Sequence, residues 1–70
     1  MKLTINGNQE EVGGEPTVSD ILKIKKVESP DMVSVELNGN ILARNDFDSV
    51  RIRENDIVEF LYFVGGGSGR

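Results

Sequence analysis

The chain has 70 residues and a formal net charge of −4 at pH 7, and it contains neither cysteine nor histidine. A chain this short forms one domain, and the missing residue types exclude disulfides, zinc sites built from Cys and His, and nucleophiles paired with His. The Lys and Arg residues are scattered, so no basic face points to a nucleic-acid partner. No apolar run reaches the roughly 18 residues that span a bilayer, and no signal-peptide pattern opens the chain, so we expect a cytoplasmic protein without a membrane partner.

The first segment of the chain predicts a β-hairpin. Apolar and polar residues alternate over residues 1–5, which is typical of a half-buried strand. Asn6-Gly7-Asn8 follows, and Asn-Gly is the strongest short hairpin signal. A second, more polar strand is therefore expected over residues 9–12.

A short helix is expected over residues 18–26. Thr17 occupies the N-cap position and Asp20 follows three residues later, a weaker form of the capping box. The apolar residues that fall on one helical face are Val18, Ile21 and Leu22. Ser29-Pro30-Asp31 then breaks the helical pattern.

The second half of the chain begins with two further strands. Alternation over residues 32–37 indicates the third strand, and a second Asn-Gly turn at Asn38-Gly39 leads into a short fourth strand beginning at residues 41–44. Residues 45–49 are expected to form a turn or a single helical turn, with Phe47 filling part of the core.

The last strand is the most apolar of the five. β-Branched and aromatic residues fill residues 57–64, after a polar turn in which Asn55 can adopt a positive φ. Residues 65–70 contain four glycines and are expected to form a flexible tail. The sequence thus predicts a folded domain over residues 1–64 and a glycine-rich C-terminal tail over residues 65–70.

The order strand, strand, helix, strand, strand, strand predicts an α+β domain, in which one main helix packs on one face of a mixed sheet of about five strands. The last strand belongs at the centre of such a sheet, because a strand this apolar needs cover on both sides. This is the ubiquitin-like β-grasp arrangement.

The end of the chain carries a recognisable series: Glu54-Asn55-Asp56, the apolar strand, and Gly65-Gly66-Gly67. An acidic turn, an apolar strand and a terminal Gly-Gly in this spacing resemble the end of the ThiS-type sulfur carriers of thiamine biosynthesis, in the ThiS/MoaD family. Upstream, Asn38, residues 41–44 and Phe47 also resemble the family pattern. The resemblance covers nearly the whole chain in length and in element order.

Three positions depart from the family pattern. Asn55 stands where the family usually has Gly, and Ala43 stands where a Pro is common. Ser68-Gly69-Arg70 follows the glycine pair at which ThiS proteins normally stop. Matching the tail to the family pattern places the functional pair at Gly66-Gly67.

The resemblance implies a carrier protein that acts as co-substrate of other enzymes. A ThiF-type adenylating enzyme would transfer AMP from ATP onto the carboxylate of Gly67, and sulfur would then displace AMP and leave a thiocarboxylate for thiazole synthase. Gly65 and Gly66 would form the thin arm that enters the partner's active site. ATP and the sulfur donor would be used by the partner enzyme, and we expect no bound cofactor or metal on this chain. The chain also lacks a general-base constellation of its own.

The alternation of the last strand predicts a docking surface. If Val58, Phe60 and Tyr62 face the core, the residues that face the other side are Glu59, Leu61 and Phe63. Exposed apolar residues beside a functional terminus indicate a partner-docking patch. The alternative is a strand that is buried on both faces, or ordinary scattered apolar residues on the surface.

The charged residues elsewhere are interpreted as solvated groups or turn formers. The carboxylates of Asp46, Asp48, Glu54 and Asp56 lack the ligand spacing of a calcium loop and are assigned to turns. The basic residues expected to be solvated are Lys23, Lys25, Lys26, Arg44, Arg51 and Arg53.

Three other functions stay open on the sequence. They are a MoaD-like carrier for molybdopterin synthesis, a ubiquitin-like modifier joined to lysines through the same glycine, and a β-grasp interaction module with an inert tail. Ser68-Gly69-Arg70 is expected to require removal before activation, by a protease of the JAMM type, unless these residues are a cloning remnant that resembles a Gly-Ser linker.

Overall fold

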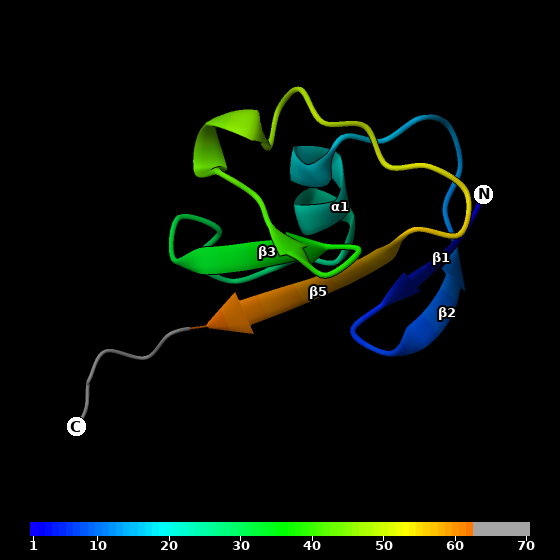
Figure 1. The fold of residues 1–70 in the computed structure, drawn as a ribbon, viewed down its shortest axis with the longest axis horizontal. Helices are drawn as coiled ribbons and strands as arrows, with labels where there is room; N and C mark the ends of the chain where they lie inside the picture. The colour runs from blue at the N-terminus through cyan, green and yellow to red at the C-terminus, as the bar shows by residue number, and fades with distance from the viewer. Residues whose placement is uncertain (63–70) are drawn as a thin grey trace.

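The last strand of the chain lies at the centre of the sheet. A computed structural model describes residues 1–62. It contains one five-stranded mixed sheet in the order β2-β1-β5-β3-β4, with a helix across one face (Figure 1). The elements are β1 (Lys2–Ile5), β2 (Asn8–Glu11), α1 (Val18–Ile24), β3 (Val33–Leu37), β4 (Asn40–Ile41), the 3₁₀ helix η1 (Arg44–Asp46) and β5 (Ile57–Tyr62). β5 runs parallel to β1 and antiparallel to β3, so the predicted β-grasp arrangement is confirmed.

Two Asn-Gly turns close the hairpins and also hold β5. Asn6 and Gly7 have φ of 52° and 85°, and Asn38 and Gly39 have φ of 51° and 87°, the pair of positive φ values that a type I′ turn requires. The side-chain oxygen of Asn6 accepts the Phe60 N–H at 2.9 Å, and that of Asn38 accepts the Ile57 N–H at 2.8 Å. The two turns therefore bind β5 from opposite sides.

The helix begins with the predicted capping box. The Asp20 N–H donates to Thr17 Oγ1 at 3.2 Å, and the Thr17 N–H donates to the Asp20 carboxylate at 3.0 Å. This backbone hydrogen bond from Thr17 is the main reason that the pKa of the Asp20 carboxyl lies below its ordinary value. The helix ends at Ile24, earlier than predicted, because Lys26 has already turned to a φ of 54°.

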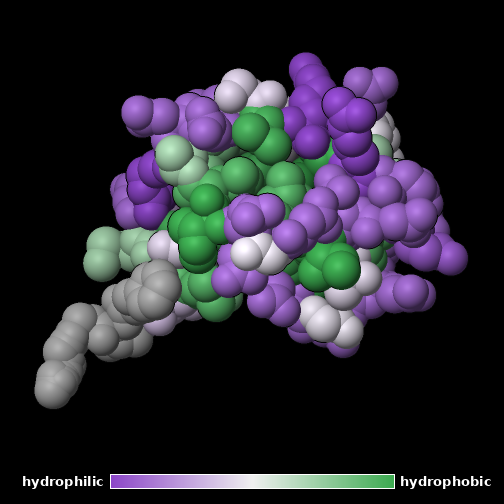
Figure 2. Space-filling view, viewed as in Figure 1, coloured by the Kyte–Doolittle hydropathy of each residue, from purple (hydrophilic) through white to green (hydrophobic). Residues whose placement is uncertain are grey.

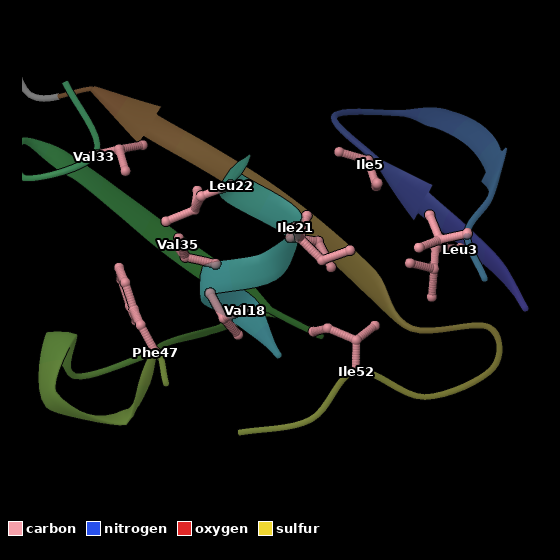
Figure 3. Close-up of a cluster of buried hydrophobic side chains, with 11 residues drawn as sticks. Leu3, Ile5, Val18, Ile21, Leu22, Val33, Val35, Phe47 and Ile52 are labelled. Carbon is pink, nitrogen blue, oxygen red and sulfur yellow. The ribbon is translucent and has the colours of Figure 1, made fainter. Parts of the chain in front are cut away.

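The core fills the space between α1 and the sheet. Val18, Ile21 and Leu22 of the helix point toward β1 and β3, while Phe47 and Ile52 close the side that the helix leaves open (Figure 3). Phe47 is buried, as predicted, and follows η1. The buried residues are Leu3, Ile5, Val12, Val18, Ile21, Leu22, Val33, Val35, Phe47, Ile52 and Val58.

The fourth strand is shorter than predicted. Only Asn40 and Ile41 pair with β3, and the Leu42 N–H makes one further bond to the Val35 carbonyl at 3.0 Å. The chain then leaves the sheet at Ala43, which caps η1. Within residues 1–62, no helix has the length and apolar character needed to cross a membrane.

Several charged side chains that were expected to be solvated hold the loops in place. Arg44 donates to the carbonyls of Pro30 and Val33 at 2.8 and 2.7 Å, and its guanidinium lies 5.3 Å from the centre of the Phe47 ring. Lys25 pairs with Glu10 at 2.6 Å and joins the helix to β2. Arg51 donates to the Glu15 carbonyl at 2.7 Å. The expectation was wrong for these three residues, because the groups that they bind are distant in the sequence.

Candidate functional site

The C-terminal end of β5 is also the end of the described chain. β3 pairs with β5 over its whole length after Ile57, from Leu37 opposite Val58 to Val33 opposite Tyr62. The ladder thus holds the strand up to the last described residue. Figure 1 shows β5 extending past the β1–β2 hairpin.

The two faces of β5 differ as the alternation predicted, with one exception. Val58 is fully buried and Phe60 packs against the core, which confirms the predicted phase for both residues. Tyr62 follows on the same face but is 51% exposed, which was not expected. It lies at the rim of the sheet, where its hydroxyl reaches the Glu28 carbonyl at 3.3 Å. An aromatic side chain with a polar tip suits such a rim position.

The face of the sheet that turns away from α1 carries the predicted docking residues. Glu59 is exposed and Leu61 is half-buried, as placed by the alternation of β5. The third predicted docking residue, Phe63, lies outside the described residues. The same is true of the predicted tail residues Gly65 and Gly66 and of the predicted reactive residue Gly67.

The strand register adds three residues that sequence reasoning missed. Glu36 is the partner of Glu59 across β3 and β5, and Ile41 is the partner of Glu36 across β3 and β4. Ile57 lies two residues before Glu59 on the same face, and it is 49% exposed. We call the five residues Glu36, Ile41, Ile57, Glu59 and Leu61 the open-face patch. Figure 2 shows hydrophobic side chains gathered beside the point where the described chain ends.

Two carboxylates stand opposite each other within the open-face patch. Like charges on directly paired residues of neighbouring strands destabilise a sheet. Between residues 1 and 62, the two ion pairs join Met1 to Glu11 and Lys25 to Glu10, so neither of them neutralises Glu36 or Glu59. The arrangement is therefore unfavourable for the free domain.

Asp56 and Glu54, two of the four acidic residues that could suggest a metal site, accept hydrogen bonds from the protein. Asp56 accepts the Arg53 N–H at 2.7 Å and the Asn38 amide at 3.0 Å, and Glu54 accepts the Lys2 N–H at 3.2 Å. Asn55 has a φ of 69°, the positive value predicted for it. Among the described residues, no group of three or more potential ligands is placed to hold a metal ion.

A shallow hollow lies on the opposite side of the molecule, beside the end of α1. It has a volume of about 210 Å³ and is lined by Ser19, Leu22, Lys23, Lys26, Val27 and Pro30. The Ser19 hydroxyl donates a hydrogen bond to the Asp48 carboxylate, but the chain has no histidine or cysteine that could complete a nucleophilic site beside them. The arrangement of the described residues thus favours presentation of the chain's end over chemistry inside a pocket.

Comparisons with known proteins match both the sequence and the fold. The sequence pattern of the ThiS family matches residues 3–67 and therefore ends at Gly67. The crystal structure of the thiamine biosynthesis protein ThiS from Geobacter metallireducens superimposes with a TM-score of 0.87 at 45% identity, covering 96% of this chain and 100% of that one.

Curated relatives agree with this assignment. The sulfur carrier protein ThiS of Bacillus subtilis is 33% identical over 51 residues, which cover 73% of this chain and 76% of that protein. A thiazole synthase of Paramagnetospirillum magneticum is 35% identical over 68 residues, which cover 97% of this chain but 21% of that protein. The chain spans about a fifth of the length of the curated thiazole synthases that it matches. The chain therefore belongs to the ThiS family.

Proposed function

We propose that this chain carries sulfur for thiazole formation in thiamine biosynthesis, as a thiocarboxylate on Gly67. The observation that supports this proposal is the family match over residues 3–67, which ends at the glycine that the tail pattern selects. The β-grasp domain contributes a strand that is paired with β3 up to Tyr62, five residues before that glycine. The folded part thus fixes the origin of the tail, and the tail supplies the reacting group.

The proposed chemistry has two steps. An oxygen of the Gly67 carboxylate attacks the α-phosphorus of ATP, which forms a glycyl adenylate and releases pyrophosphate. A hydrosulfide ion from the sulfur donor then attacks the glycyl carbonyl carbon, AMP leaves with the electrons of the broken C–O bond, and loss of the S–H proton gives the thiocarboxylate. Gly67 retains one sulfur in place of one oxygen. A ThiF-type adenylating enzyme supplies the catalytic groups, ATP and the sulfur donor are its substrates, and the carrier binds no cofactor.

The composition of the tail suits delivery into a narrow site. Gly65, Gly66 and Gly67 have no side chains, so they can enter a slot that any larger residue would block. The reach of the tail is limited, since five residues beyond Tyr62 extend at most about 18 Å. The adenylating enzyme must therefore bind close to the end of β5.

The open-face patch is the surface that we assign to this docking. Leu61 and Glu59 lie on it beside the end of β5, and Phe63 continues the same alternation in the sequence. Exposed Ile41 and Ile57 enlarge the apolar area around the two carboxylates. The patch thus combines apolar side chains with two carboxylates, and a partner surface that offers apolar contacts and basic groups would complement it.

Thiazole synthase is the acceptor that the comparisons support. The thiazole synthases of Paramagnetospirillum magneticum and Magnetococcus marinus each contain a segment similar to nearly the whole of this chain. A carrier-like segment within the same polypeptide supports a working partnership between the two activities. For such a carrier we propose a cytoplasmic location, with neither nucleic acid nor membrane as a partner.

A comparison of chains with and without the three residues after Gly67 tests whether Gly67 is the reacting residue. In a chain that ends at Arg70, the Gly67 carbonyl is held in an amide to Ser68, and the free carboxylate belongs to Arg70. A long cationic side chain is disfavoured in a slot shaped for glycine. We expect pyrophosphate exchange by the adenylating enzyme with the chain ending at Gly67 and none with the chain ending at Arg70, which a JAMM-type protease would have to trim.

Equal exchange by both chains, with the C-terminus at Arg70 verified by intact mass, would move the reacting carboxylate to Arg70. Accumulation in cells of lysine-linked conjugates alone, without any thiocarboxylate, would instead establish the ubiquitin-like modifier function.

A further inference from the structure

One edge of β5 has no strand beside it over its last residues. β1 pairs with β5 only at Thr4 opposite Ile57 and Ile5 opposite Val58. The chain then turns away at Asn6-Gly7 into β2, while β3 continues along the other edge as far as Tyr62. In Figure 1, the outer half of β5 has β3 on one side and nothing on the other.

The alternation of the backbone shows which groups face this open edge. The Ile57 carbonyl accepts from Asn38 on the β3 side, and the Val58 carbonyl accepts from Asn6 at 2.9 Å on the β1 side. Even-numbered residues of β5 therefore direct their N–H and C=O groups toward the β1 side. The Phe60 N–H is taken by the Asn6 side chain. The Phe60 carbonyl and the Tyr62 N–H face the same edge, and no group within residues 1–62 pairs with either.

The other two edges of the sheet lack these features. β2 at one end consists of Asn8-Gln9-Glu10-Glu11, whose charges discourage pairing with another strand, and β4 at the other end has two residues. Charged residues and short strands are the usual protection of a sheet edge. Phe60-Leu61-Tyr62 carries neither form of protection. This segment is thus the part of the described sheet best suited to accept an added strand.

We propose that an extended segment of the adenylating enzyme pairs with this edge of β5, donating a backbone N–H to the Phe60 carbonyl and accepting the Tyr62 N–H. The inference rests on the proposed function, because the reaction proposed at Gly67 is what identifies the adenylating enzyme as the partner at this edge. Gly67 lies five residues beyond Tyr62, so the site of the enzyme that holds Gly67 must lie within about 18 Å of this edge.

The pairing has a specific consequence for the tail. Two backbone hydrogen bonds at Phe60 and Tyr62 fix the direction in which the chain leaves the domain. Fewer orientations of the tail then remain to be restricted when Gly67 meets ATP, and such restriction of geometry lowers the barrier to reaction. The open-face patch provides affinity, and the edge provides alignment.

Amide hydrogen exchange on the unaltered chain ending at Gly67 tests this directly. In the free chain, we expect rapid exchange at Tyr62 and protection at Leu61, whose N–H faces Ser34 of β3. Addition of the cognate ThiF-type enzyme with a non-cleavable ATP analogue should slow Tyr62 exchange at least tenfold. Unchanged Tyr62 exchange in a complex that protects the open-face patch would overturn the proposal. Protection of Tyr62 in the free chain that grows with concentration would also overturn it, because a second copy would then occupy the edge.

A pair of variants separates the backbone group from the side chain. Tyr62→Pro and Tyr62→Val both remove the phenol, but only proline also removes the N–H, and proline is tolerated at an unpaired strand edge. We expect kcat/KM for pyrophosphate exchange to fall about tenfold further in Tyr62→Pro than in Tyr62→Val, as for the loss of a backbone hydrogen bond in the bound state. Retained amide protection at Leu61 verifies the fold of each variant.

Equal rates for the two folded variants would overturn the pairing and leave the proposed function intact. Failure of the unaltered chain to support pyrophosphate exchange by the adenylating enzyme would instead contradict the proposed function. If Tyr62→Pro does not fold, the amide hydrogen exchange of Tyr62 in the unaltered chain decides whether the pairing occurs.

Discussion

The two faces of the sheet use the same strands for opposite purposes. On the face covered by α1, Leu3 and Val58 of neighbouring strands are at most 1% exposed. On the other face, Ile57 is 49% exposed and Ile41 is 57% exposed, and two glutamates stand opposite each other. Because side chains alternate along a strand, β5 contributes to both faces at once. The covered face provides the stability, and the open face can retain residues that suit a partner.

The largest expected effect comes from placing the same charge on each face. Val58→Asp buries a carboxylate without a partner, which costs several kcal/mol of the roughly 5–15 kcal/mol that stabilises a domain. We expect this variant to be largely unfolded by circular dichroism. The matched control, Ile57→Asp, changes the adjacent residue on the open face and should melt cooperatively. Equal loss of structure in both variants would show that the open face is buried in the free protein.

A smaller effect is expected for docking. Leu61→Asp should leave the domain folded and weaken binding of the ThiF-type enzyme by about 2 kcal/mol, as for an apolar hot spot, measured by calorimetry. Phe63→Asp is expected to behave in the same way on the sequence pattern. The control is Ile24→Asp, which makes a comparable change at a residue of α1 that is 52% exposed and distant from the patch.

Ile24→Asp should bind as the unaltered chain does. Unchanged affinity of folded Leu61→Asp would remove the open-face patch from the docking surface, and unfolding of that variant would place Leu61 in the core.

The smallest expected effect concerns the two facing glutamates. Glu36→Lys converts a repulsive cross-strand pair with Glu59 into an attractive one, so it should stabilise the free domain by about 0.2–1 kcal/mol. Chemical denaturation at low and high salt measures this gain, which should shrink at high salt because exposed charges are screened. Glu36→Gln is the control and should give a smaller gain. A loss of stability in Glu36→Lys would show that the glutamates do not repel each other in the free chain.

The parts of the fold that depend on local chemistry were predictable from the sequence. Asn6-Gly7 and Asn38-Gly39 specify type I′ turns because those residues accept positive φ, and Thr17 with Asp20 specifies the start of the helix. The alternation in β5 correctly placed Val58 and Phe60 toward the core. Each of these signals lies within a few neighbouring residues.

Features set by contacts distant in the sequence were missed. Arg44 reads as a surface charge, yet it binds carbonyls of Pro30 and Val33 that the fold brings beside it. Glu36 could not be joined to the docking surface from its own strand, since its position opposite Glu59 depends on the register of β3 and β5. The unpaired edge at Phe60 and Tyr62 likewise depends on where β1 ends relative to β5.

The role of Gly67 as the sulfur-bearing residue is tested most directly by intact-mass measurement. The chain ending at Gly67 is incubated with the cognate ThiF-type enzyme, ATP and a sulfur donor, and a Gly67→Ala chain serves as the control for the tail. We predict a mass increase equal to the exchange of one oxygen for one sulfur, located by fragmentation at the C-terminal residue and dependent on ATP. An unchanged mass in the presence of active enzyme, or sulfur located anywhere other than the Gly67 carboxylate, would contradict the account.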